Sequence, residues 1–122
     1  MYQQDWDMLN VEIVGKYIAR RILHKDKISY EVSDELKPSQ ADLLYKKLKD
    51  LIMERRICEA ENLLFENLNT NNIEYLAIAL DCYQSINQLT EAELEENDFS
   101  RQEINDGLNE IIHKFHIPTI DI

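Results

Sequence analysis

Residues 39–68 read SQADLLYKKLKDLIMERRICEAENLLFENL, and this stretch decides the fold. Its first half places Leu44, Leu48 and Leu51 three or four residues apart, so these side chains share one face of a helix. Ser39 precedes that run and is a suitable N-cap residue. After a short break at 55–58, apolar residues return with the same period: Ala60, Leu63, Leu64 and Leu68. The stretch therefore predicts two helices that form an antiparallel hairpin.

The rest of the C-terminal half continues the helical pattern. Residues 69–72 (NTNN) form a turn cluster, and an apolar stripe predicts a helix over about 73–88. Thr90 is followed three residues later by a glutamate, which fits a capping box and starts a short helix that ends near residue 97. Ser100 repeats this pattern and starts a last helix over 100–116, which a proline ends.

Two of these hairpins resemble each other at an offset of 32 residues. The corresponding positions are Leu44, Leu48, Leu51, Glu59, Ala60 and Glu61 against Leu76, Leu80, Tyr83, Glu91, Ala92 and Glu93. A period near 34 is typical of tetratricopeptide helix pairs, in which a small residue, here Ala60 or Ala92, lies where two helices cross closely. We therefore predict an all-α fold of five or six helices, with tetratricopeptide-like antiparallel hairpins over 39–97.

The N-terminal helix, predicted over 1–24, is apolar on two sides. One stripe holds Trp6, Leu9, Ile13 and Tyr17, and the other holds Met8, Val11, Ile18 and Ile22. Such a helix is either central to its domain or shared with another subunit. In a chain of this size we favour sharing, which predicts a homo-oligomer with interface residues Trp6, Ile13 and Tyr17. Gly15 would let a neighbouring helix approach closely.

The segment 25–38 breaks the helical pattern. Ile28, Tyr30 and Val32 alternate with polar residues, as in a strand, but the sequence offers no second strand to pair with them. We predict an extended connector laid over the core, with pairing to a symmetry mate in a dimer as the alternative. The whole chain, 1–122, is then one helical domain.

Composition narrows the class of protein. The chain has 122 residues, 44% of them apolar, and only two Gly and two Pro, which suits one helical core. Residues 1–56 carry a net charge of +1 and residues 57–122 carry −12. An acidic half repels phosphate and anionic lipid, so we expect neither nucleic acid nor a membrane as a partner. Without a signal sequence or a long apolar run, and with Cys58 and Cys82 as reduced thiols, the chain is expected to be cytoplasmic.

The sequence offers few candidates for chemistry. Glu110, His113 and His116 follow a helical spacing that could hold a metal, so a small metal-binding protein or metalloenzyme is the alternative function. The ordinary explanation is that histidines near a helix C-terminus interact favourably with the helix dipole. No nucleophile motif or glycine-rich phosphate loop is present, so we expect no enzyme activity and no cofactor. A ligand pocket between helices is a third alternative.

Several segments together resemble one family of proteins. They are Met1 to Trp6, Asp42 to Lys46, Glu59 to Glu66, Leu80 to Tyr83 and Asp98 to Ser100. The chain is similar to an uncharacterised family of short, acidic, helical proteins from Gram-positive bacteria of the Firmicutes type. The resemblance implies a bacterial cytosolic protein with helical hairpins, and it implies no catalytic residue. We therefore expect a non-catalytic module that binds another protein.

Overall fold

The structure is a computed structural model, and it describes residues 11–24 and 28–117. Within these ranges the chain forms six α-helices and one short π-helix, and no strand. The elements in chain order are α2 (Val11–Ile18), η1 (Ala19–Leu23), α3 (Gln40–Met53), α4 (Ile57–Glu66), α5 (Ile73–Asn87), α6 (Glu91–Glu96) and α7 (Arg101–Lys114). The predicted all-α class with five or six helices is confirmed.

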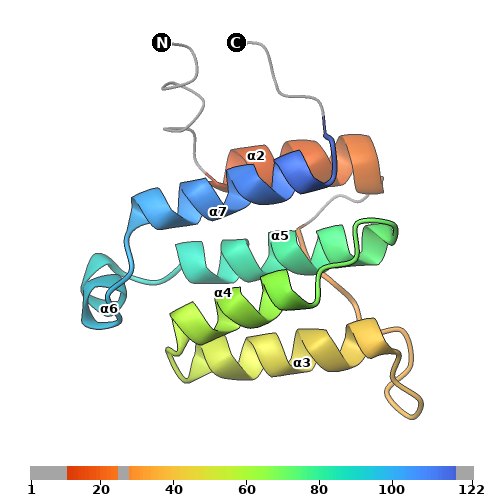
Figure 1. The fold of residues 1–122 in the computed structure, drawn as a ribbon, viewed down its shortest axis with the longest axis horizontal. Helices are drawn as coiled ribbons and strands as arrows, with labels where there is room; N and C mark the ends of the chain where they lie inside the picture. The colour runs from red at the N-terminus through yellow and green to blue at the C-terminus, as the bar shows by residue number, and fades with distance from the viewer. Residues whose placement is uncertain (1–10, 25–27, 118–122) are drawn as a thin grey trace.

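Helix α5 is the centre of the fold. Helices α2 and α7 lie together on one side of α5, and α3 lies on the other side with α4 packed against it (Figure 1). Every residue of α5 from 75 to 83 is buried, whichever way its side chain points. A helix that is apolar all round belongs in the interior of a domain. In the described part of the chain, α5 rather than the N-terminal helix has this position.

The hairpin of α3 and α4 forms as predicted from its periodicity. Ser39 is the N-cap of α3: its hydroxyl accepts a hydrogen bond from the Asp42 N–H, and the Asp42 carboxylate accepts one from the Ser39 N–H. Arg55 has a left-handed backbone (φ 65°) that ends α3, and the Arg56 N–H donates to the Leu51 carbonyl at 2.8 Å. This hydrogen-bond pattern stops the helix and turns the chain into α4.

The two other predicted caps form to different extents. Thr90 and Glu93 make the complete capping box at the start of α6, as predicted. The Ser100 hydroxyl accepts from the Glu103 N–H at 3.1 Å, but the structure shows no hydrogen bond from the Ser100 N–H to the Glu103 carboxylate. Ser100 is therefore a simple N-cap of α7, and the prediction of a second capping box is wrong.

The repeat of the hairpin does not extend to the second pair. Ala60 is buried in α4, as the pattern requires, whereas Ala92 is exposed on α6. Helix α6 has only six residues, too few to form a second long antiparallel partner, and α5 packs on α7 instead. The correspondence between Ala60 and Ala92 therefore fails because the chain turns away after a single short helix.

Both glycines allow close approaches. A Cβ atom on Gly107 of α7 would lie 2.2 Å from the hydroxyl oxygen of Tyr83 on α5, so this glycine lets the two helices approach each other. A Cβ atom on Gly15 would lie 2.6 Å from the Cδ1 of Ile28. The neighbour of Gly15 is therefore the connector, not another helix, contrary to the prediction.

Candidate interaction surfaces

The outer face of α2 exposes two of the three predicted interface residues. Ile13 is 61% exposed and Tyr17 is 38% exposed, whereas Val14 and Ile18 are buried against the core. Among the described members of the two predicted stripes, Ile18 faces inward, whereas Ile13 and Tyr17 face outward. Trp6, the third predicted residue, lies outside the described residues. We refer to Ile13 and Tyr17 together as the α2 stripe.

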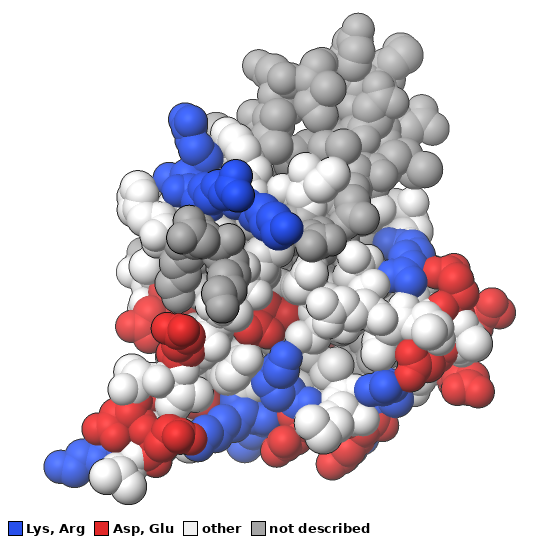
Figure 2. All heavy atoms as spheres, turned by 180° about the vertical axis from the view of Figure 1, so that it is seen from behind, with Lys and Arg blue, Asp and Glu red and all other residues white. Residues whose placement is uncertain are grey.

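Basic residues gather close to this stripe. Arg20 and Arg21 are exposed on η1, and the guanidinium of Arg21 lies 5.9 Å from the centre of the Tyr17 ring. Figure 2 shows the corresponding cluster of basic side chains near the end of η1, while acidic and basic side chains mix along the opposite edge of the molecule. The α2 stripe therefore continues into a positively charged surface.

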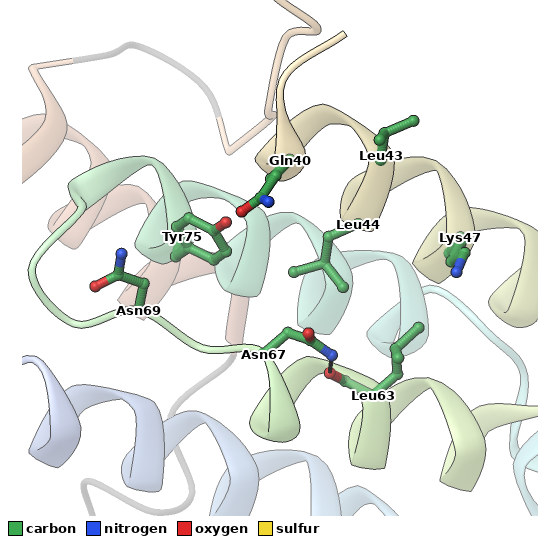
Figure 3. Close-up of a pocket in the computed structure, with 8 residues that line it drawn as sticks. All are labelled: Gln40, Leu43, Leu44, Lys47, Leu63, Asn67, Asn69 and Tyr75. Atoms are coloured by element: carbon green, nitrogen blue, oxygen red, sulfur yellow. Dashed lines mark hydrogen bonds between the residues drawn. The ribbon is translucent and has the colours of Figure 1, made fainter.

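A groove of about 480 Å³ lies on the other side of α5, between α3, α4 and the start of α5 (Figure 3). Leu43, Leu44, Leu63 and the ring of Tyr75 form its apolar surface. Leu44 and Tyr75 are buried, whereas Leu43 is 50% exposed at the rim. The remaining lining residues are polar: Gln40, Lys47, Asn67 and Asn69. We call this site the α3–α4–α5 groove.

The polar groups of the groove are only partly used within the chain. Tyr75 is 9% exposed, and its hydroxyl points along the groove toward Gln40 (Figure 3). Among the described residues, neither this hydroxyl nor the Gln40 side-chain amide has a hydrogen-bond partner. By contrast, the Asn67 amide donates to the Leu63 carbonyl at 2.9 Å, and Asn69 accepts from the Asn71 N–H at 3.0 Å. The groove thus presents two unused polar groups beside apolar side chains.

Asp42 holds the connector against α3 at one end of the groove. Its carboxylate is fully buried and accepts hydrogen bonds from the Tyr30 hydroxyl (2.5 Å), the Ser33 hydroxyl (2.7 Å) and the Ser39 N–H (3.0 Å). The hydrogen bond from Tyr30, followed by the one from the Ser39 backbone, lowers the pKa of Asp42 well below its ordinary value. Burial, and then the Asp42 carboxylate, raises the pKa of Tyr30.

Asp81 joins the same connector to α5. It is buried and accepts from the Tyr30 N–H at 2.8 Å, the Tyr45 hydroxyl at 3.1 Å and the Lys49 ammonium at 3.2 Å. Lys49 also donates to the Ser85 hydroxyl at 2.7 Å. Asp42 and Asp81 together, which we call the aspartate clasp, therefore hold the connector, α3 and α5 in one arrangement and keep the groove walls in place.

A second cavity, of about 470 Å³, lies between the end of η1, the connector and the start of α5. Ile22, Leu23 and Ala77 contribute apolar surface, and Glu31 and Glu74 contribute carboxylates. Tyr30 also lines this cavity, and its hydroxyl lies 3.5 Å from the Glu74 carboxylate. A residue that is bonded to both aspartates of the clasp therefore borders the cavity. The predicted alternative of a pocket between helices thus has two structural candidates.

The predicted metal-binding residues do not form a site. Among the described residues, no group of three or more His, Cys, Asp or Glu side chains is placed to hold a metal ion. His113 lies in the last turn of α7, but His116 lies beyond the C-cap and has a left-handed backbone (φ 56°). The helical spacing that would align Glu110, His113 and His116 therefore ends before the third residue, and the metal-site alternative is not retained.

Comparisons with known proteins identify a family but no activity. Over the described residues, no helix has both the length and the apolar character needed to cross a bilayer. No curated protein and no solved structure matches the chain. The model of a family of unknown function, DUF6483, matches residues 1–116, in agreement with the resemblance to an uncharacterised family. The chain therefore belongs to this family of unknown function, DUF6483.

Proposed function

We propose that this chain is a non-catalytic module that binds another protein, and that it assembles with a second copy of itself through the α2 stripe. The observation that carries the proposal is the exposure of Ile13, at 61%, next to a half-exposed Tyr17. Large apolar side chains that a single subunit leaves in water are typical anchors of protein interfaces. The lack of nucleophile and phosphate-binding motifs in the sequence supports the non-catalytic part.

The charge distribution supports assembly between copies. Arg20 and Arg21 extend the stripe with positive charge, and residues 57–122 carry a net charge of −12. Opposite charges on the two halves of the chain favour contact between copies and speed their encounter. A bacterial, cytosolic setting belongs to the same proposal. The tetratricopeptide-like interpretation is kept only for the hairpin of α3 and α4, where Ala60 is buried.

Size-exclusion chromatography with light scattering tests the self-association. We expect the wild-type chain to have a mass above that of a monomer at roughly 1–100 μM, the range in which modest interfaces form. The double variant Ile13→Ser with Tyr17→Ser should be monomeric, because both anchors are removed. Met53→Ser is the matched control, since Met53 is 74% exposed on α3, away from the stripe. A wild-type chain that is monomeric at every concentration would end this proposal.

A further inference from the structure

The surface next to the α2 stripe carries positive charge that the fold does not neutralise. The other exposed side chains that the structure describes on α2 and η1 are Lys16, Arg20 and Arg21, and none is acidic. Arg20 and Arg21 form no ion pair with a described residue, and the Arg21 guanidinium lies 5.9 Å from the centre of the Tyr17 ring. A chain that covers the stripe therefore meets both guanidinium groups, and carboxylates at that place make the contact favourable. We call Arg20 and Arg21 the basic end.

The far end of the molecule carries negative charge that is also not neutralised. Two glutamates of α6 pair with arginines of the same chain. Glu95, Glu96 and Asp98 are exposed, and none of them forms an ion pair with a described residue. We call these three residues the acidic end. Helix α6 lies at one end of the long axis of the molecule and η1, the orange continuation of α2, lies at the other (Figure 1). The molecule therefore presents unpaired charges of opposite sign at its two ends.

These charges bear on how two copies can meet. If the α2 stripes of two copies packed on each other, both copies would use the same patch. Four arginines would then border the contact, and none of the exposed side chains described on α2 and η1 would offer them a carboxylate. A contact between the basic end of one copy and the acidic end of another pairs each arginine with a carboxylate instead.

We propose that copies of this chain join head to tail: the α2 stripe and the basic end of one copy dock on the acidic end of the next. This inference rests on the proposed self-association and names the surface that receives the stripe. Burial of Ile13 and Tyr17 supplies affinity, and the ion pairs set the orientation. The association should weaken when NaCl is raised from about 50 to 500 mM, because salt screens exposed ion pairs.

Charge-reversal variants of the full chain test this contact by size-exclusion chromatography with light scattering. Glu95→Lys with Glu96→Lys should raise the dissociation constant by at least about tenfold, because like charges then face each other. Arg20→Glu with Arg21→Glu should have the same effect. An equimolar mixture of the two double variants should recover the mass of the wild-type assembly, because each end of one variant is complementary to the other end of the second variant.

Glu35→Lys with Glu66→Lys is the matched control. Both glutamates are exposed and belong to neither end, and their reversal changes the net charge by the same amount. This variant should therefore change the dissociation constant by less than about twofold. Far-UV circular dichroism checks that each variant is folded.

The self-association and the head-to-tail contact fail in different ways. A wild-type chain that is monomeric at every concentration overturns the self-association and, with it, this inference. If the wild-type chain associates and Glu95→Lys with Glu96→Lys associates as tightly, only the head-to-tail contact is overturned. The same holds if the mixture of the two reversed variants stays monomeric, or if the control variant loses as much affinity as the variant of the acidic end.

Discussion

Replacing Gly107 by alanine should destabilise the protein through the contact between α5 and α7. The added Cβ would lie 2.2 Å from the Tyr83 hydroxyl oxygen, 2.5 Å from its Cζ and 2.7 Å from its Cε1. Tyr83 is 1% exposed and donates a hydrogen bond to Glu61 at 2.6 Å. Since the ring is enclosed and anchored, the helices must separate or the ring must leave its hydrogen bond.

The expected magnitude follows from two opposing effects. Adding a methyl group to a filled core costs roughly 1–3 kcal/mol, and a contact with a buried aromatic ring places this variant in the upper part of that range. Alanine is a better helix former than glycine by about 1 kcal/mol, which offsets part of the cost. The net loss of stability should be about 1–2 kcal/mol, equivalent to a fall in Tm of roughly 3–10 °C.

Urea unfolding followed by circular dichroism measures this loss directly. We expect a lower midpoint with an unchanged slope for Gly107→Ala. Gly15→Ala is the matched control, because the three atoms nearest to its Cβ all belong to the flexible Ile28 side chain, with Cδ1 at 2.6 Å and Cγ1 at 3.3 Å. That variant should stay within about 1 kcal/mol of the wild type, given the gain in helix propensity. A Gly107→Ala protein as stable as the wild type, or more so, would refute the packing argument.

Three further predictions concern polar groups that are buried or partly buried. Tyr83→Phe removes the hydrogen bond to Glu61 and should cost about 1 kcal/mol, measured by the same urea titration. The pKa of Asp42 is lower in the folded state than in the unfolded state, so the ionised carboxylate should stabilise the fold fully above about pH 4. This stabilisation should be lost as the pH falls further. Thermal unfolding at a series of pH values should show a fall in Tm at acid pH, and Tm should depend less steeply on pH in Asp42→Asn. Burial raises the pKa of Glu61, so ionisation of this group opposes folding above the unfolded-state pKa of about 4.3. Glu61→Gln should therefore raise the Tm at pH 7, and an equal or lower Tm would contradict this assignment.

The hairpin of α3 and α4 could be predicted because its signals are local. Leu44 and Leu48 repeat at helical spacing, and Ser39 supplies the N-cap. The position of α5 could not be predicted in the same way. Its apolar stripe predicted a helix over about 73–88, but periodicity did not show that the run from Tyr75 to Tyr83 is buried on all sides. The signal available in the sequence was that this run is apolar almost throughout, which is typical of a helix at the centre of a domain.

The groove and the aspartate clasp depend on contacts between distant residues. Tyr30 and Asp81 are 51 positions apart, and sequence spacing alone does not show that they meet. Tyr75 and Gln40 likewise come to the same groove only through the packing of α5 on α3. Asp81 within the apolar run of α5 was a signal, since a carboxylate in a buried helix needs hydrogen-bond donors. The identity of those donors required the structure.

The central place of α5 has a consequence for how the chain folds during synthesis. One side of α5 packs on α3, which the ribosome makes earlier, but the other side packs on α7, which is made after α5. Until residues 101–114 emerge, a nascent chain leaves the α7-facing side of α5, including Tyr83, without its cover. A chain cut before Arg101 should therefore expose apolar surface, bind the dye ANS and aggregate, rather than persist as a smaller native domain.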